Sequence, residues 1–206
     1  MKFTESMLEE YSKPLSETED NHCKNAIRMV SEAMKPLGFT DDGKELTKLY
    51  SDTLAYSIEL RNLSEGRKVK LFVQGSYANN TNVRTKSDVD IAVVQEDVFQ
   101  TKYRTSGSYI QSDADYNFVT AKARSISFRD EVEKCLKDKF GKDVERKKKS
   151  IKVHGNTYRK DADAVPCKRY RDYTNDYRND VNNYIGAISI HTDDEETIIN
   201  YPEQHI

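Results

Sequence analysis

The sequence predicts an α+β fold with helices flanking a sheet, and three stretches of its hydrophobic pattern indicate it. Residues 16–37 repeat apolar side chains at helical spacing. Residues 69–94, VKLFVQGSYANNTNVRTKSDVDIAVV, read as a strand, a polar loop and a second strand. Residues 150–165 alternate on either side of a Gly-Asn pair, as a β-hairpin does. Helices and strands are therefore both expected.

Bulk composition bounds the class of protein. At 206 residues, one domain spanning residues 1–206 is expected, large enough for a substantial core. Charged residues make up 33% of the chain and hydrophobic residues 36%, so its surface is very polar. The net charge of −2 gives no bulk electrostatic reason to bind nucleic acid or an anionic membrane.

Cysteine usage and the N-terminus indicate the compartment. Cys23, Cys135 and Cys167 are odd in number and widely spaced, which argues against a disulfide framework or a zinc knuckle and favours reduced thiols. The N-terminus lacks the apolar segment of a signal peptide, and no stretch approaches the ~20 apolar residues that span a bilayer. A cytoplasmic protein is expected.

Two helices are predicted ahead of the first strand. The first, 16–37, opens on a possible capping box of Ser16 and Glu19 and ends at Gly38. The second covers about 43–64. Both carry an apolar stripe that we interpret as core; in the first helix it consists of Cys23, Ala26, Ile27, Val30, Ala33, Met34 and Leu37.

The segment 69–94 holds the strongest chemical signal. Side chains on a strand alternate faces, so Asp88 and Asp90 point the same way. Two carboxylates on one face of an otherwise apolar strand repel each other and require compensation. A divalent cation is the favoured candidate, because Mg²⁺ is commonly held by one or two carboxylates together with substrate phosphates.

The Gly75-Ser76 step after the strand 69–73 supplies the other half of this predicted site. Glycine lets the backbone turn and approach a ligand closely. A short helix starting at about 76–81 would direct free N–H groups at a phosphate, and the Ser76 hydroxyl could add a hydrogen bond. The pattern predicts a triphosphate between this cradle and the two carboxylates.

These motifs resemble those of the DNA polymerase β-like nucleotidyltransferases. QGS at 74–76 followed by DVDI at 88–91 matches their signature, and DADAVPC at 161–167 and INYPEQH at 199–205 look like the CD-NTases among them. CD-NTases are bacterial relatives of cyclic GMP–AMP synthase that act in anti-phage (CBASS) defence. The resemblance covers roughly residues 15–206. It implies a polymerase β-like core with a mixed, mostly antiparallel sheet flanked by helices.

The resemblance also implies the third acidic residue. A returning strand over 157–165 carries Asp161 and Asp163 on one face, so spacing alone does not choose between them. The family places its aspartate shortly before an apolar-Pro step, which here selects Asp163 ahead of Pro166. Asp161 is then interpreted as a solvated or supporting acid.

The implied activity is synthesis of cyclic or linear oligonucleotide second messengers from ATP, alone or with GTP, UTP or CTP. Asp88, Asp90 and Asp163 would act as catalytic residues by holding two Mg²⁺ (or Mn²⁺) ions, while Gly75 and Ser76 would bind the nucleotide. Little covalent chemistry falls to the protein, since such catalysis is mostly positioning and charge neutralisation. Defence-system proteins are possible partners. A membrane partner is not expected.

The segments between these motifs carry weaker signals. Residues 95–115 are expected to be irregular, as a substrate-facing loop or a loop without a role, and a third helix is predicted over 117–139. The basic run 146–149 is either a solvated approach to a strand or a phosphate or RNA contact. Pro166 is expected to end regular pairing of its strand.

Beyond that proline, residues 168–183 mix Tyr, Arg and acids, and are read as a solvated loop in preference to a base-stacking surface. A strand is expected over 185–190, followed by an acidic turn over 193–196. His205 matches the family's Pro-x-x-His position and is assigned a structural role. The four histidines form no metal-ligand spacing.

In the family, a helical C-terminal lobe follows that histidine, and nothing in the chain corresponds to it. We therefore expect either a truncated form of a longer protein, inactive alone, or a short form that uses a partner. Two alternative functions stay open. One is a nucleotidyltransferase acting on a protein, a tRNA or a small molecule; the other is an inactive nucleotide-binding fragment.

Overall fold

The computed structural model describes residues 15–37, 57–59, 69–78, 88–121, 125–194 and 196–201, and all structural statements concern these ranges. Most of the predicted helix 43–64, the polar loop 79–87 and the predicted role of His205 lie outside them.

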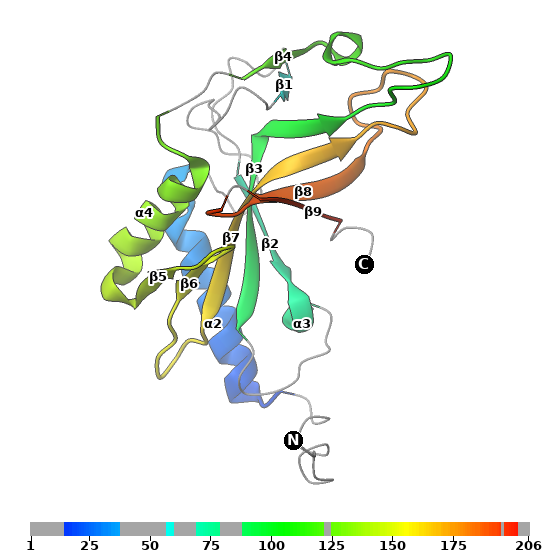
Figure 1. Ribbon diagram of the computed structural model, residues 1–206. Helices are drawn as coiled ribbons and strands as arrows, with labels where there is room; N and C mark the ends of the chain where they lie inside the picture. The colour runs from blue at the N-terminus through cyan, green and yellow to red at the C-terminus, as the bar shows by residue number, and fades with distance from the viewer. Residues whose placement is uncertain are drawn as a thin grey trace.

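The described strands form one mixed sheet, ordered β4-β1-β3-β7-β6-β5, with β2 added to β3, β8 added to β7 and β9 added to β8 (Figure 1). Only the β3–β7 pair among these ladders is parallel, which confirms the expected mostly antiparallel arrangement. The strands are β1 (Ser57–Glu59), β2 (Val69–Gln74), β3 (Val89–Lys102), β4 (Phe118–Thr120), β5 (Val144–Arg146), β6 (Ile151–Val153), β7 (Ala162–Asp172), β8 (Ile185–His191) and β9 (Thr197–Asn200).

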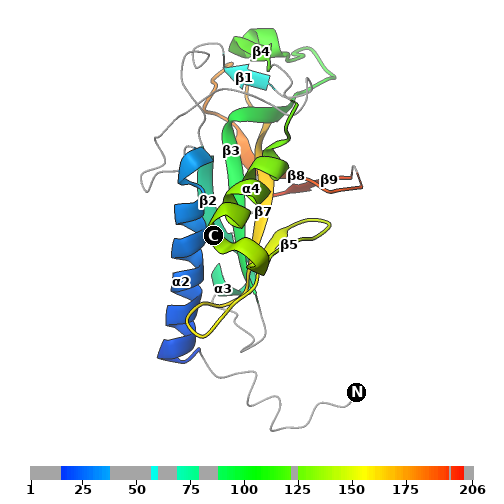
Figure 2. The same ribbon diagram turned by 90° about the vertical axis from the view of Figure 1, so that its left-hand side faces the viewer.

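Two helices cover one face of this sheet. Figures 1 and 2 show α2 (Glu17–Ala33) and α4 (Phe128–Phe140) beside each other on the same side of β3 and β7. Side chains from both helices and from alternate strand positions form the main core, so burial of their apolar faces joins the two layers. That core includes Ala26, Val30, Met34, Val89, Ile91, Val93, Val132, Leu136, Ile151, Val153, Ala162 and Ala164.

The predicted first helix is confirmed with a shorter C-terminal end. Its capping box is present, because the Ser16 hydroxyl accepts from the Glu19 N–H while the Glu19 carboxylate accepts from Ser16. Helix α2 ends at Ala33, and a separate 3₁₀ turn, η1 (Lys35–Leu37), follows. Pro36 explains the break, since a proline there lacks an N–H and its ring disfavours helix in the preceding turn.

Two other helix predictions were wrong in part. Residues 57–59, within the predicted second helix, form strand β1, which pairs with β4 and with β3 at Phe99. The predicted helix 117–139 begins only at Phe128, where the Ser127 hydroxyl caps the Asp130 N–H. Its expected first turn is instead β4. In both places, pairing between segments far apart in sequence overrides local periodicity.

The strand after Asp88 is longer than expected. Residues 95–102, predicted as irregular, continue β3, with an irregularity in register between Gln95 and Phe99. Most of them pair with the second half of β7. This pairing buries polar residues such as Gln95 and Asp97, whose residue types are typical of a loop.

Strand β7 likewise continues through Pro166 to Asp172, so the prediction that this proline ends regular pairing was wrong. On one edge of β7, β6 pairs with residues 162–164 and β8 with residues 167–172. Pro166 lies between these two partners, where a missing N–H is tolerated.

The prediction of a solvated loop over 168–183 was wrong in part, since residues 168–172 belong to β7 and the loop that follows is partly buried. Tyr173 is fully buried and packs with Tyr116, Phe118 and Phe99 at the end of β3 remote from Asp88. Asp176 is also buried and accepts hydrogen bonds from Tyr116 and Asn183. A short 3₁₀ helix, η3 (Asp113–Tyr116), carries Tyr116 into this cluster.

The predicted hairpin over 150–165 pairs β6 with β7 as expected, but its connection is not a two-residue turn. Residues 154–161 form a longer loop, in which Asn156 and Arg159 make an isolated bridge. A 3₁₀ turn, η4 (Gly141–Asp143), joins α4 to β5.

Candidate active site

Four polar side chains form a row across the face of the sheet opposite α2 and α4. Gln74 pairs with Asp90, Asp90 with Asp163, and Asp163 with Lys152. Paired residues point to the same face, so the row crosses β2, β3, β7 and β6. The helix-facing neighbours, such as Ile91 and Ala164, belong to the core.

Asp90 and Asp163 therefore lie side by side, which places the acid that the family resemblance selects next to Asp90. Burial raises the pKa of Asp90, and the neighbouring carboxylates of Asp163 and Asp88 raise it further. The Asp163 Oδ1 atom is buried and accepts no hydrogen bond within the described structure. Lys147 Nζ lies 3.5 Å from that oxygen, at the distance of a loose ion pair.

Gly75 closes one side of the row. It begins the four-residue helix α3 (Gly75–Ala78) with a φ of +71°, a conformation that other residues rarely adopt. A Cβ at this position would lie 2.5 Å from Asp90 Oδ2, so only a glycine lets the backbone approach that carboxylate. Helix α3 is tied to α2 by the Tyr77 hydroxyl, which donates to Asp20 Oδ1 at 2.8 Å.

Ser76 lies in α3 directly after Gly75, but its side chain is outside the described structure. The hydroxyl contact predicted for Ser76 therefore stays a prediction.

Asp88 lies just before β3 and faces Lys152. Lys152 Nζ is 2.8 Å from Asp88 Oδ2 and 2.7 Å from Asp161 Oδ2. Burial opposes the charged form of Asp161, but the hydrogen bonds from Lys152 and from the Gly155 N–H outweigh it and lower the pKa of Asp161. Asp161 is thus a supporting acid that binds Lys152.

The residues fit a divalent cation by the chemistry of their donors. Carboxylate oxygens are the ligands that Mg²⁺ prefers, and the buried Asp163 Oδ1 lacks a hydrogen-bond donor. Within the described ranges, however, no three or more His, Cys, Asp or Glu side chains converge as a metal-binding group. Asp90 and Asp163 in the row offer carboxylate oxygens to a divalent cation, while Asp88 forms an ion pair with Lys152.

Three neighbours of the carboxylates were missed in the sequence: Gln74, Lys147 and Lys152. Lys152 could have been found, because Ile151 and Val153 share one face of their strand and Lys152 must then share the other face with Asp163. Gln74 follows from the pairing register of β2 with β3, which the sequence does not give.

The rest of the basic run 146–149 serves the fold. Arg146 binds Asp193, Asp130 and Glu133, and Lys148 binds Asp194. Acidic groups of the chain thus neutralise two members of the run, which favours the solvated, structural interpretation over a phosphate or RNA contact.

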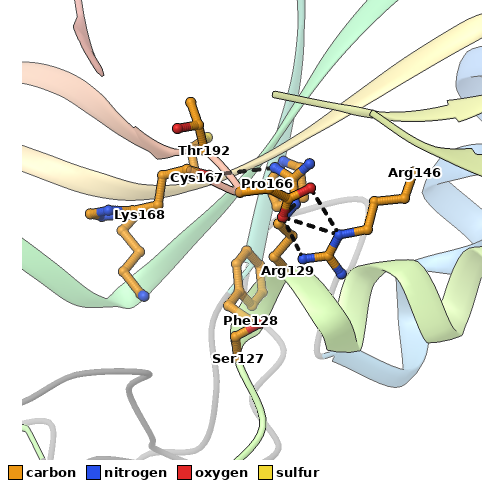
Figure 3. Close-up of a pocket in the computed structure, with 10 residues that line it drawn as sticks. Ser127, Phe128, Arg129, Arg146, Pro166, Cys167, Lys168 and Thr192 are labelled. Atoms are coloured by element: carbon orange, nitrogen blue, oxygen red, sulfur yellow. Dashed lines mark hydrogen bonds and ion pairs between the residues drawn. The ribbon is translucent and has the colours of Figure 1, made fainter. Parts of the chain in front are cut away.

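A pocket of about 200 Å³ lies at the gap between β6 and β8, and it does not include the carboxylate row. Figure 3 shows Arg129 and Arg146 converging there from α4 and β5. Arg129 Nε and Arg146 Nη2 lie 3.2 Å and 2.7 Å from Asp193 Oδ1. Asp193 thus forms ion pairs with both arginines of the pocket, and we assign the pocket no function.

Other chemistry is not supported in the described residues. All three cysteines are free thiols, as predicted. His154 pairs with Glu145 beside the 154–161 loop and does not contact the carboxylate row. Among the described helices, none has the length and apolarity needed to cross a membrane.

Comparisons with known proteins agree with this geometry. A family model described as "Nucleotidyltransferase domain" matches residues 57–184. A curated relative, "Cyclic GMP-AMP synthase CdnE03" of Staphylococcus schleiferi, is 50% identical over all of this chain.

Two solved structures share the fold across 99% of the chain. The Elizabethkingia meningoseptica CdnE cyclic dinucleotide synthase with GTP and Apcpp has a TM-score of 0.59 at 29% identity, over 57% of its own chain. The Rhodothermus marinus CdnE c-UMP-AMP synthase with Apcpp and Upnpp has a TM-score of 0.66 at 26% identity, over 58% of its own chain. The chain also spans 62% of the staphylococcal relative. These matches confirm the resemblance to CD-NTases, and the chain belongs to the nucleotidyltransferase domain family.

Proposed function

We propose that this chain is the nucleotidyltransferase core of an enzyme that makes cyclic oligonucleotide second messengers from nucleoside triphosphates in bacterial anti-phage signalling. The observation that carries the proposal is the direct pairing of Asp90 with Asp163 on parallel strands, beside a glycine that leaves no room for a side chain. The similarity to CdnE synthases supports the choice of product class.

The carboxylates supply negative charge where phosphate chemistry requires divalent cations. Asp88, Asp90 and Asp163 are the proposed ligands, and Mg²⁺ or Mn²⁺ bound there would neutralise phosphate charge and lower the pKa of an attacking hydroxyl. Asp90 and Asp163 are held in register by the β3–β7 ladder, so their separation is fixed by backbone hydrogen bonds. Such fixed geometry lowers the cost of positioning at the reacting centre.

Gly75 and Ser76 are the proposed contacts to the triphosphate. Gly75 brings backbone close to Asp90, so a phosphate lying against that backbone would also lie near the proposed metal ligands. ATP is the expected substrate, alone or with GTP, UTP or CTP.

Product analysis tests the proposal. The 206-residue chain, and any longer gene product that contains it, would be incubated with radiolabelled ATP, GTP, CTP and UTP and with Mg²⁺ or Mn²⁺. Products would then be treated with phosphatase and separated by chromatography. Phosphatase-resistant products, lost in the Asp88→Ala/Asp90→Ala double variant, are expected.

Two outcomes would contradict it. A product that remains in the double variant would place the chemistry elsewhere. Labelled protein or RNA in place of a small phosphatase-resistant product would indicate a transferase with a macromolecular acceptor.

A further inference from the structure

Lys152 is the best-positioned cation beside the proposed metal ligands. Its side chain is only 13% exposed, and its ammonium group lies within 2.8 Å of Asp88 Oδ2 and 2.7 Å of Asp161 Oδ2. A partly buried ammonium group that bridges two carboxylates makes charge-assisted hydrogen bonds, which are stronger than neutral ones.

The far end of this bridge is firmly anchored. Asp161 Oδ1 accepts the Gly155 N–H at 2.6 Å. A Cβ on Gly155 would lie 2.7 Å from the Arg159 carbonyl oxygen, so the loop is closed tightly around Asp161. Arg159 is itself buried and donates to Asp143 and to the His154 carbonyl oxygen. Lys152 is therefore held on the Asp161 side, and it draws Asp88 toward that side.

The ammonium group of Lys152 changes what the carboxylate row can bind. Among contacts between described residues, Asp88 is the proposed ligand whose carboxylate accepts a hydrogen bond from an ammonium group at 2.8 Å, while Lys147 Nζ lies 3.5 Å from Asp163 Oδ1. The described side chains also lack a converged group of three acids. A carboxylate oxygen has two lone pairs. The positive charge of the Lys152 ammonium group on Asp88 Oδ2 nevertheless opposes the binding of a divalent ion to the same carboxylate.

We propose that Lys152 is an internal counter-cation for Asp88, and that its ammonium group competes with a divalent ion for the Asp88 carboxylate. The proposal rests on the proposed function, in that Asp88, Asp90 and Asp163 are taken as the metal ligands. Lys152 acts through Asp88 and is a positioning residue.

Charge gives the direction of the expected effect. Replacing Lys152 with a neutral residue removes both the competitor for Asp88 and a positive charge that repels the incoming ion. Divalent-ion binding should therefore become tighter, by at least about tenfold for a full charge removed at this range. A residue that only orients Asp88 would have the opposite effect on affinity.

Mn²⁺ binding without nucleotide is the test, measured by the electron paramagnetic resonance signal of free Mn²⁺. The main variant is Lys152→Gln, which keeps a hydrogen-bond donor. Lys152→Arg keeps the charge, and Lys149→Gln removes an exposed charge from the nearby basic run 146–149. We expect Lys152→Gln alone to bind at least about tenfold more tightly than the wild type. Equal or weaker binding by Lys152→Gln would overturn the proposal.

Folding of the variant is controlled separately. If Lys152→Gln is less stable than the wild type without metal, its melting temperature is followed during Mn²⁺ addition, and a larger rise than in the wild type is expected. The wild type gives an independent measurement, in which acetylation of Lys152 is quantified by mass spectrometry. Saturating Mg²⁺ should increase that acetylation, and unchanged labelling would overturn the proposal.

The Asp90→Asn variant separates this proposal from the proposed function. If Mn²⁺ binds the wild type, is lost in Asp90→Asn and is no tighter in Lys152→Gln, only the role of Lys152 is overturned. If neither the wild type nor Lys152→Gln binds Mn²⁺, or if Asp90→Asn binds it unchanged, the proposed metal site is overturned and the role of Lys152 with it.

Discussion

Asp90 and Asp163 are directly opposed on the parallel strands β3 and β7, although 73 positions of sequence separate them (163 − 90). Parallel strands need a long crossover, and here that crossover contains β4, α4, β5 and β6. The carboxylate pair therefore exists only once most of the described core has formed. The electrostatic repulsion between the two carboxylates is offset by the hydrogen bonds of the β3–β7 ladder and by packing on the helix-covered face.

That repulsion predicts the effect of removing one acid. Asp90→Asn should abolish metal-dependent turnover, because a proposed ligand is lost. Its melting temperature should match the wild type or exceed it by up to ~4 °C, because a buried carboxylate with a raised pKa is replaced by a neutral isostere. Thermal melts and product assays on the same preparation check this. Unfolding of Asp90→Asn would show that the charge stabilises the fold.

Gly75 gives a second prediction. Gly75→Ala should lower activity by on the order of 100-fold, because a methyl group would collide with Asp90 Oδ2 and displace it. The positive φ should also cost roughly 1–2 kcal/mol of stability. Gly107→Ala is the matched control, since Gly107 also has a positive φ but nothing within 4 Å of the position that the added methyl group would take. Equal loss of activity in both variants would assign the effect to backbone strain alone.

The strands that carry the site could be predicted from sequence, because their patterns are local. Alternation of Asp88, Val89 and Asp90 fixes which side chains share a face, and the apolar runs at 69–73 and 185–190 are strands in the structure. Choosing Asp163 over Asp161 required the family resemblance. In the structure Asp163, and not Asp161, pairs with Asp90, and the role of Asp163 as a ligand stays a prediction.

The ends of elements could not be predicted, because distant partners determine them. Residues 95–102 look like a polar loop, yet Lys102 pairs with Asp172 across β3 and β7. Pro166 looks like a strand terminus, but it falls where two partner strands leave a gap. Periodicity cannot indicate such gaps, since they depend on where β6 ends and β8 begins.

The capping box of α2 predicts a modest, purely structural effect. Ser16→Ala removes the acceptor for the Glu19 N–H and should cost about 1 kcal/mol. In a chain of this size that corresponds to a melting temperature lower by roughly 2–4 °C. Activity at temperatures below the melting transition should not change, because the cap contacts none of the three proposed metal ligands. A loss of activity larger than the loss of folded protein would contradict this.

Asp176 predicts a pH-dependent stability that is independent of the active site. Its carboxylate is 1% exposed and accepts from Tyr116, Asn183 and the backbone N–H groups of Arg178 and Asp180. Burial disfavours its charge, but these hydrogen bonds prevail and lower the pKa of Asp176 below its ordinary value of 3.8. The folded state therefore releases this proton more readily than the unfolded state.

The sign of the pH effect follows from that difference. Because the pKa is lowered on folding, Asp176 adds stability above the unfolded value, and this stability is lost as the pH falls from about 3.8 through the lower folded pKa. Asp176→Asn should lower the free energy of unfolding by roughly 1–3 kcal/mol at pH 7. The NH₂ group of the asparagine would face O–H and N–H donors and could not accept hydrogen bonds from them. The difference in stability between Asp176→Asn and the wild type should shrink as the pH falls from about 3.8 through the folded-state pKa. Melting temperatures between pH 7 and pH 3 measure it, with exposed Asp138→Asn as the control. A difference that stays constant with pH would show that the cost of Asp176→Asn lies in packing and not in charge.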